Sequence, residues 1–215
     1  MTREKLFWGI DEAGRGPVLG PMVVALVGIT ESAQVKLQQA GVSDSKSFGS
    51  SLGAHLKRMD LVGLIEQEAS FVDVRVVLPA EIDFYTSQGK LNDLERRCAR
   101  ELILQACPQG IDSIVADGQS LFSPLCLEFP SLQAINKADA VDVSVSAASI
   151  VAKTRRDLAF MKLVESYQQE FPFFTRAGGG YMNLPTKRFM RAYKEKYGKY
   201  PQETRTSWNL SFIDI

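Results

Sequence analysis

Residues 7–21 read FWGIDEAGRGPVLGP, and this stretch decides how the rest of the chain is interpreted. An apolar run ends in two adjacent acids, Asp11 and Glu12, and a Gly-Arg-Gly turn follows at once. Carboxylates beside a buried segment are costly unless a cation neutralises them. A divalent metal is the expected cation, and the amides and guanidinium of the turn suit an anionic ligand close by.

Outward from this stretch, the apolar pattern predicts strands alternating with helices. We expect strands at residues 5–11, 18–29, 71–78, 111–117 and 132–136. We expect helices at residues 51–68, 91–107, 143–165 and 185–197. Asp142 or Ser144 suits the N-cap of the third helix. Strands mixed with helices, and then helices alone, indicate a mixed α/β sheet with a helical C-terminal extension.

Length and composition narrow the class of protein. The chain has 215 residues, of which 45% are hydrophobic, and this suits one domain with a small appendage. No apolar run is long enough for a membrane span, and the opening residues do not resemble a signal peptide. The three cysteines form no metal-ligand cluster, so we expect a reduced, cytoplasmic protein.

Charge is unevenly distributed along a chain whose net charge is zero. Residues 151–215 hold 12 Lys and Arg against 6 Asp and Glu, whereas residues 1–150 hold 13 against 19. An anionic polymer could lie on the basic end while metals mask the acidic one. An ordinary solvated helical surface explains the charge pattern equally well.

Three apolar segments end in acids, at Asp11-Glu12, Asp117 and Asp139. Strand ends at one edge of a sheet often share a site, and four carboxylates converge if these ends meet. Like charges so close together cannot all stay ionised without cations. Oxygen ligands favour Mg²⁺ or Mn²⁺ over zinc. Two such ions would activate a water and stabilise the leaving oxygen in phosphodiester hydrolysis.

Each acid also has an ordinary structural explanation when it is taken alone. An acidic pair after a strand is a common turn, Asp117 before Gly118 is a usual strand exit, and Asp139 could cap a helix. Their joint order is much harder to explain in this way. The single histidine, His55, lies in a stretch with helical spacing, which argues against a Ser-His-Asp triad.

Four segments together resemble the ribonuclease HII family, within the type 2 ribonuclease H group. They are GIDEAGRGPVLGP (9–21), DSK (44–46), ADG (116–118) and KADAVDVSVSAASIVAKTRRD (137–157). The resemblance implies a ribonuclease H-like catalytic domain at residues 1–170, with a mixed five-stranded sheet flanked by helices. It also implies that a basic helical extension, residues 171–215, packs on that domain.

By the same resemblance, the chain is expected to be a metal-dependent endoribonuclease. Members of the family cleave RNA in RNA–DNA hybrids and ribonucleotides embedded in duplex DNA, and they leave 3′-hydroxyl and 5′-phosphate ends. They use Mg²⁺ or Mn²⁺ in a two-metal site. We therefore expect a protein that acts in ribonucleotide excision repair, with nucleic acid as its partner. We also expect a monomer with no membrane association.

The resemblance also assigns roles to individual residues. The acids that match the family's catalytic metal ligands are Asp11, Glu12, Asp117 and Asp139. The turn that contacts the 2′-hydroxyl, the group that separates RNA from DNA, is matched by Gly14, Arg15 and Gly16. Lys46 matches a basic residue near the substrate phosphates, and Tyr181 matches a tyrosine that packs on the sugar next to the ribonucleotide.

Two departures from the family's pattern bear on substrate preference. The family shows Gly-Tyr, one residue and then Thr, whereas MNLP separates Tyr181 from Thr186 here, so the loop is three residues longer. The segment ETRTSW (203–208) resembles the family's His-Arg-x-Ser-Phe ending without its histidine. We expect cleavage of hybrids to survive these departures better than the preference for a lone ribonucleotide.

Two other functions stay open at this point. A hybrid-binding protein with weak or lost catalysis would bind its substrate without cutting it, although all four acids are present. A related metal-dependent nuclease directed at DNA would share the fold, although the Gly-Arg-Gly turn favours RNA.

Overall fold

In a computed structural model the chain forms two compact units, and residues 4–43 and 52–213 are described. The first unit contains the chain up to Ala13 together with Val24–Arg75 and Asn92–Thr154. The second contains Gly14–Val23, Val76–Leu91 and the chain from Arg155 onward. Each unit is therefore assembled from three separate segments of the chain.

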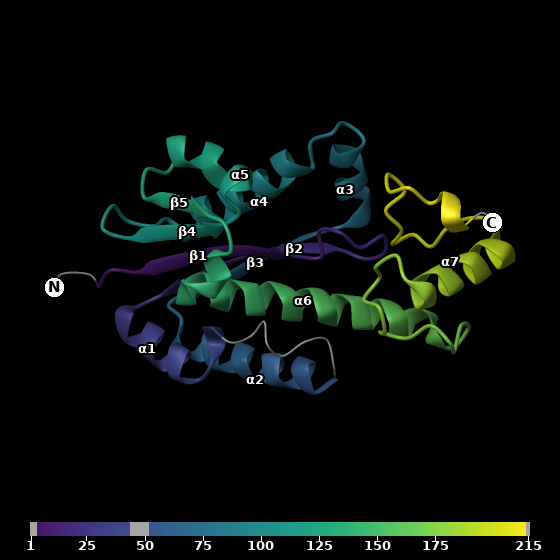
Figure 1. Cartoon of the computed structure of the whole chain (residues 1–215), viewed down its shortest axis with the longest axis horizontal. Helices are drawn as coiled ribbons and strands as arrows, with labels where there is room; N and C mark the ends of the chain where they lie inside the picture. The colour runs from purple at the N-terminus through teal and green to yellow at the C-terminus, as the bar shows by residue number, and fades with distance from the viewer. Residues whose placement is uncertain (1–3, 44–51, 214–215) are drawn as a thin grey trace. The chain divides into compact units, whose positions relative to one another are not determined.

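Five strands form one sheet, in the order β3-β2-β1-β4-β5 (Figure 1). Their bounds are β1 Phe7–Ala13, β2 Met22–Ile29, β3 Phe71–Val77, β4 Ser113–Asp117 and β5 Leu132–Ile135. Strand β4 pairs in parallel with β1 on one side and with β5 on the other. The mixed five-stranded sheet that the resemblance implied is confirmed.

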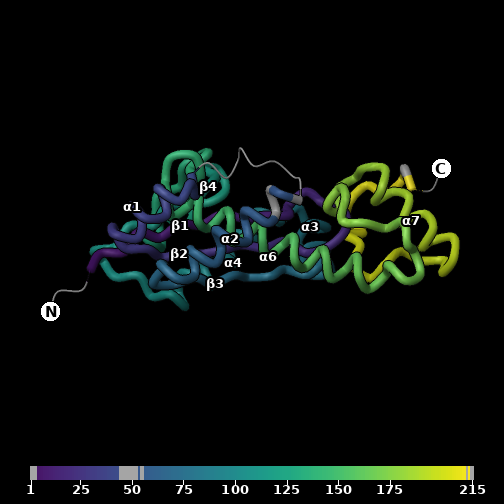
Figure 2. Tube along the Cα trace, turned by 90° about the horizontal axis from the view of Figure 1, so that it is seen from below, coloured from purple at the N-terminus to yellow at the C-terminus, as the bar shows by residue number. Residues whose placement is uncertain are grey.

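The helices lie between and after these strands. Their bounds are α1 Glu31–Gln39, α2 Leu52–Glu68, α3 Pro79–Thr86, α4 Leu91–Ala106, α5 Gln119–Phe122, α6 Val143–Gln168 and α7 Leu184–Tyr197. Short 3-10 helices occupy Ser123–Leu127, Ala138–Ala140 and Ser211–Ile213. In the first unit, α1 and α2 cover one face of the sheet and α4 covers the other (Figures 1 and 2). Within the described ranges, no helix has the length and apolar character needed to cross a bilayer.

Helix α6 approaches β1 closely because Gly9 carries no side chain. A Cβ atom at Gly9 would lie 2.1 Å from the carbonyl carbon of Ser144 and 2.2 Å from the amide nitrogen of Val145. The small side chains in the first turns of α6 are buried as well, at Ala147, Ala148, Ser149 and Ala152. The start of α6 is therefore held against the strand that carries Asp11.

The N-terminus of α6 is capped by Asp142, one of the two predicted candidates. Its Oδ1 atom accepts hydrogen bonds from the amides of Ser144 and Val145, at 2.9 and 3.2 Å. The hydroxyl of Ser144 also donates to this oxygen, at 2.6 Å. These bonds satisfy amides that have no partner within the helix.

Three local predictions were incomplete or wrong. Residues 18–21 were expected in a strand, but β2 begins only at Met22, because Gly20 has a positive φ of 92° and Pro21 follows it. Pro79 does end the third strand, but it also occupies the first turn of α3, which was not predicted. Helix α1 was not predicted either.

A buried acid, Asp112, ties the entry of β1 to the chain before β4. Its Oδ1 atom accepts a hydrogen bond from the amide of Leu6, at 2.9 Å. Its Oδ2 atom accepts from the indole N–H of Trp8 and from the amide of Gln109, at 3.2 and 2.8 Å. Both carboxylate oxygens are thus used as acceptors in the interior.

We expect Asp112→Asn to lower the free energy of unfolding by about 1–3 kcal/mol, because an amide N–H₂ would then face buried donors. Denaturant titration followed by circular dichroism measures this change. The exposed Asp60 in α2 offers a control, since Asp60→Asn should change stability by less than about 0.5 kcal/mol. Equal unfolding midpoints for Asp112→Asn and the parent would contradict the role assigned to Asp112.

The second unit has a hydrophobic core of its own. Its centre is a stacked ring pair, Phe174 and Phe189, with centroids 3.7 Å apart and planes 7° from parallel. Val18 and Leu19, from the segment between β1 and β2, are fully buried in the same core. The segment that contains the Gly-Arg-Gly turn is therefore anchored among aromatic side chains of the second unit.

Candidate metal centre

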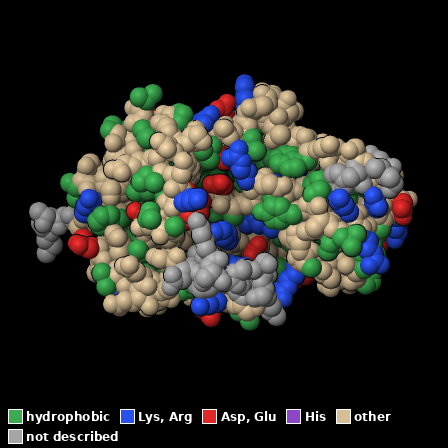
Figure 3. All heavy atoms as spheres, viewed as in Figure 1, with side chains coloured by type: hydrophobic (Ala, Val, Ile, Leu, Met, Phe, Trp, Pro, Cys, Tyr) green, Lys and Arg blue, Asp and Glu red, His purple; other side chains and the backbone are tan. Residues whose placement is uncertain are grey.

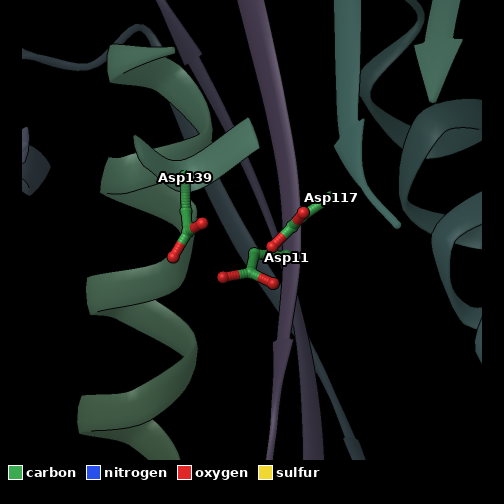
Figure 4. Close-up of side chains that lie close together, drawn as sticks. All are labelled: Asp11, Asp117 and Asp139. Carbon is green, nitrogen blue, oxygen red and sulfur yellow. The ribbon is translucent and has the colours of Figure 1, made fainter. Parts of the chain in front are cut away.

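Three acids from separate parts of the chain lie side by side in the first unit (Figure 4). Asp11, Asp117 and Asp139 each offer a carboxylate oxygen, and these oxygens all lie within 4.8 Å of one another. Asp11 is in β1, and Asp117 is the last residue of β4, a parallel neighbour of β1. Parallel neighbours bring their carboxyl ends to the same edge of a sheet, which accounts for this meeting.

The third acid reaches the group through a tight turn before α6. Lys137 adopts a left-handed conformation with a φ of 58°, and Asp139 follows in a short 3-10 helix. The amide of Ala138 donates to Oδ1 of Asp117, at 3.0 Å. The hydroxyl of Ser146 donates to the backbone carbonyl of Asp139, at 2.5 Å. These two hydrogen bonds hold the turn against β4, through Asp117, and against α6, through Ser146.

Burial has the largest effect on the pKa of Asp11. Asp11 and Asp139 are each only 6% exposed. Burial raises the pKa of Asp11 to about 6, although hydrogen bonds from Ser149 and the Glu12 amide and the charge of Lys153 oppose the rise. A bound divalent cation would favour the ionised form of Asp11. An all-oxygen donor set of this kind fits Mg²⁺ or Mn²⁺.

Two residues of α6 near Asp11 were not predicted. Ser149 hydrogen-bonds to the Asp11 carboxylate, and the ammonium of Lys153 donates to the Ser149 hydroxyl at 2.7 Å. The two residues are four apart and therefore share one face of the helix. The sequence does show their spacing of four residues within segment 137–157. That spacing predicts a place near Asp11 only when α6 is known to pack on β1.

Glu12 is the fourth acid of the predicted ligand set. The group of three does not include Glu12, within the part of the chain that the structure describes. Neighbouring residues of a strand point to opposite faces, and the Glu12 amide donates to Oδ1 of Asp11 at 2.8 Å. The metal-binding role of Glu12 stays a prediction. Lys46 and the side chain of His55 lie outside the described residues.

The Gly-Arg-Gly turn belongs to the second unit, and its shape requires the first of its glycines, Gly14. Gly14 has a φ of 79°, and a Cβ there would lie 2.8 Å from the Pro21 carbonyl oxygen and 2.9 Å from Cγ of Arg156. A Cβ on Gly16 would lie 3.5 Å from the ring of Tyr181. The structure thus brings the turn and Tyr181 together.

The residues that lengthen the loop after Tyr181 have a structural role. Asn183 caps α7, because its side chain accepts a hydrogen bond from the Thr186 amide, at 3.3 Å. Leu184 and Pro185 then form the first turn of α7. The lengthened loop thus supplies the N-cap and the first turn of α7, and Tyr181 lies beside Gly16.

Helix α7 presents a basic surface in the second unit. Figure 3 shows Lys and Arg side chains gathered over this helix. The basic residues of α7 are Lys187, Arg188, Arg191, Lys194 and Lys196. Its buried positions include Phe189 and Met190, so charge and core contact are divided between its faces.

Comparisons with known proteins all match the chain to one family. The family model described as Ribonuclease HII matches residues 8–211. A Ribonuclease HII from Methanococcus vannielii is 33% identical, and the match covers 98% of this chain and 86% of that protein. A Ribonuclease HII from Thermococcus onnurineus is 36% identical over 93% of this chain and 86% of that protein.

Solved structures agree with this result. The ribonuclease H2 of Pyrococcus horikoshii OT3 is 29% identical, with a TM-score of 0.77 and 97% of each chain covered. The RNase HII in a PCNA complex from Archaeoglobus fulgidus is 28% identical, with a TM-score of 0.79 and the same coverage of both chains.

Proposed function

The chain belongs to the ribonuclease HII family and is an endoribonuclease of the ribonuclease H type, and we propose that it cleaves at single ribonucleotides embedded in duplex DNA as well as within hybrids. We propose further that it depends on Mg²⁺ or Mn²⁺ and leaves 3′-hydroxyl and 5′-phosphate ends. A monomer with this activity would serve ribonucleotide excision repair.

The convergence of three buried or half-buried carboxylates is the observation that carries this proposal. Asp11, Asp117 and Asp139 would hold the divalent ions, and Glu12 would complete the ligand set. Ions bound there would supply activation of the attacking water and stabilisation of the leaving oxygen. The chain itself contributes the placement of its carboxylates, which β1, β4 and the turn before α6 hold in position.

Recognition of the substrate is assigned to other residues. The turn from Gly14 to Gly16 would read the 2′-hydroxyl, and Tyr181 would pack on the neighbouring sugar. Lys46 and the basic surface of α7 would hold phosphates, which position a nucleic acid without reading it. The Tyr181 ring lies 3.5 Å from the place that a Cβ on Gly16 would occupy, and this proximity supports a shared role for the turn and the tyrosine.

Cleavage of one matched pair of duplexes tests the proposal. A DNA duplex with a single ribonucleotide should be cut at that position at least about 1,000-fold faster than the duplex with the 2′-deoxy nucleotide there, because a 2′-hydroxyl is the only difference. Mapping the product ends shows whether they carry 3′-hydroxyl and 5′-phosphate groups. EDTA should stop cleavage, and added Mg²⁺ or Mn²⁺ should restore it. Equal cutting of the two duplexes would refute the substrate assignment.

A further inference from the structure

Arg205 is a buried cation of the second unit that the proposed site does not use. Its side chain is fully buried, and its guanidinium donates three hydrogen bonds to backbone carbonyls. The acceptors are the carbonyls of Gly14, Arg15 and Gly20, at 2.6, 2.8 and 3.0 Å. Two of these carbonyls belong to the turn assigned to the 2′-hydroxyl.

Placing this charge in the interior is unfavourable by itself. Burial, together with the smaller effect of the nearby Arg156 charge, lowers the pKa of Arg205 to about 10. A buried cation is tolerated only when hydrogen bonds replace its lost water. The planar fork of arginine can bind several acceptors at fixed angles, which a lysine ammonium does not do. The geometry of the fork therefore explains why an arginine occupies this position.

The backbone around Arg205 is paired with the segment that follows the turn. The amide of Arg205 donates to the carbonyl of Val18, at 2.8 Å, and the amide of Gly20 donates to the carbonyl of Glu203, at 2.9 Å. Leu19 and Thr204 form an antiparallel bridge between these bonds. Arg205 thus enters the turn region from a fixed backbone position.

Asp83 of α3 holds the two residues that follow Arg205. Its Oδ2 atom accepts from the amide and the hydroxyl of Thr206, both at 2.8 Å. Its Oδ1 atom accepts from the amide and the hydroxyl of Ser207, at 3.0 and 2.5 Å. Burial opposes ionisation of Asp83, but the bonds from Ser207 and Thr206 outweigh it and lower the pKa of this acid.

The hydrogen bonds from Arg205 fix the direction of the turn's amides as well as that of its carbonyls. A trans peptide is planar, so its N–H points away from its C=O. The carbonyl of Gly14 shares a peptide plane with the amide of Arg15, and the carbonyl of Arg15 shares one with the amide of Gly16. Because both carbonyls point at the buried guanidinium, both amides point away from it.

We propose that Arg205, held in place by Asp83, is a positioning residue that orients the amides of the Gly-Arg-Gly turn for reading a 2′-hydroxyl. This inference rests on the proposed function, because the turn must contact the hydroxyl for its orientation to matter. Arg205 touches no substrate and acts through the turn alone. It therefore affects discrimination between RNA and DNA and leaves general binding of phosphates intact.

Steady-state kinetics on two ligands test this inference. For a DNA duplex with one ribonucleotide, Arg205→Met and Arg205→Lys should lower kcat/KM about 10- to 100-fold, since a misplacement of about 1 Å has effects of this size. For the same duplex made wholly of DNA and used as a competitive inhibitor, Ki should stay within about twofold of its parental value, because phosphate contacts do not read the sugar. Circular dichroism and thermal unfolding confirm that each variant is folded.

Other variants separate the possible outcomes. Asp83→Asn should also lower kcat/KM for the duplex with one ribonucleotide, by a smaller factor than the Arg205 variants. If neither Arg205 variant folds, this variant tests the positioning role. Arg97→Met serves as the control and should change neither constant, since Arg97 lies on the exposed side of α4 and pairs with Glu101. Parental kcat/KM in Arg205→Lys, or a Ki that rises in parallel with the loss of kcat/KM, would overturn the positioning role. Failure of the parent protein to prefer the ribonucleotide would instead refute the proposed function.

Discussion

Asp11→Asn is expected to abolish cleavage of an RNA–DNA hybrid, with a fall in kcat on the order of 1,000-fold or more. Asparagine keeps the shape of the side chain but removes a negative charge from a site where three carboxylate oxygens lie within 4.8 Å of one another. The two remaining acids would then bind divalent ions more weakly and in a different arrangement. Turnover measured over a range of Mg²⁺ and Mn²⁺ concentrations gives the size of the loss.

Binding and folding should survive this substitution. Fluorescence anisotropy with a labelled hybrid should show nearly parental affinity, because phosphate contacts are assigned to other residues. Asp60→Asn removes an equivalent charge from the exposed surface of α2 and should leave turnover unchanged. Undiminished turnover in Asp11→Asn would rule out the metal centre.

Gly9→Ala is expected to have the largest effect on stability, a loss of more than about 3 kcal/mol in the free energy of unfolding. The new Cβ would lie 2.1 to 2.2 Å from backbone atoms of Ser144 and Val145, which no rotamer change can relieve. Helix α6 would have to move away from β1. Asp139, just before α6, would then move away from Asp11, so the folded fraction should lose activity too.

Denaturant titration and activity at low temperature measure the two effects separately. Gly63 offers a matched control, because it lies inside α2 and a Cβ there meets nothing within 4 Å. Gly63→Ala should stabilise the protein by up to about 1 kcal/mol, since alanine favours a helix over glycine. If Gly9→Ala is as stable as the parent, the close approach of α6 to β1 is not a requirement of the fold.

The elements that could be predicted are those whose own stretch of sequence carries a clear apolar pattern. Strands β4 and β5 appear as short apolar runs, and the acids at strand ends follow from where those runs stop. Helix α1 gives a weak signal, since only Ala33 and Leu37 are buried in it. Helix α3 was missed because Pro79 was interpreted only as the end of a strand.

Contacts between distant parts of the chain could not be predicted in this way. The carboxylate of Asp83 meets Ser207 across 124 positions, and neither neighbourhood has a pattern that predicts the other. The segment around Arg205 resembles a family motif, yet the resemblance does not say which atoms the guanidinium binds. Such pairs become visible only when the backbone path is known.

The pairing of Arg205 with the turn also sets an order of events during synthesis. A ribosome makes Gly14 early and Arg205 only 191 residues later. Until that late segment leaves the exit tunnel, a nascent chain has acids at its strand ends but lacks the guanidinium that completes the turn. If Arg205 orients the turn as we propose, selectivity for ribose is acquired only after this late segment has left the exit tunnel, among the last steps of the protein's maturation.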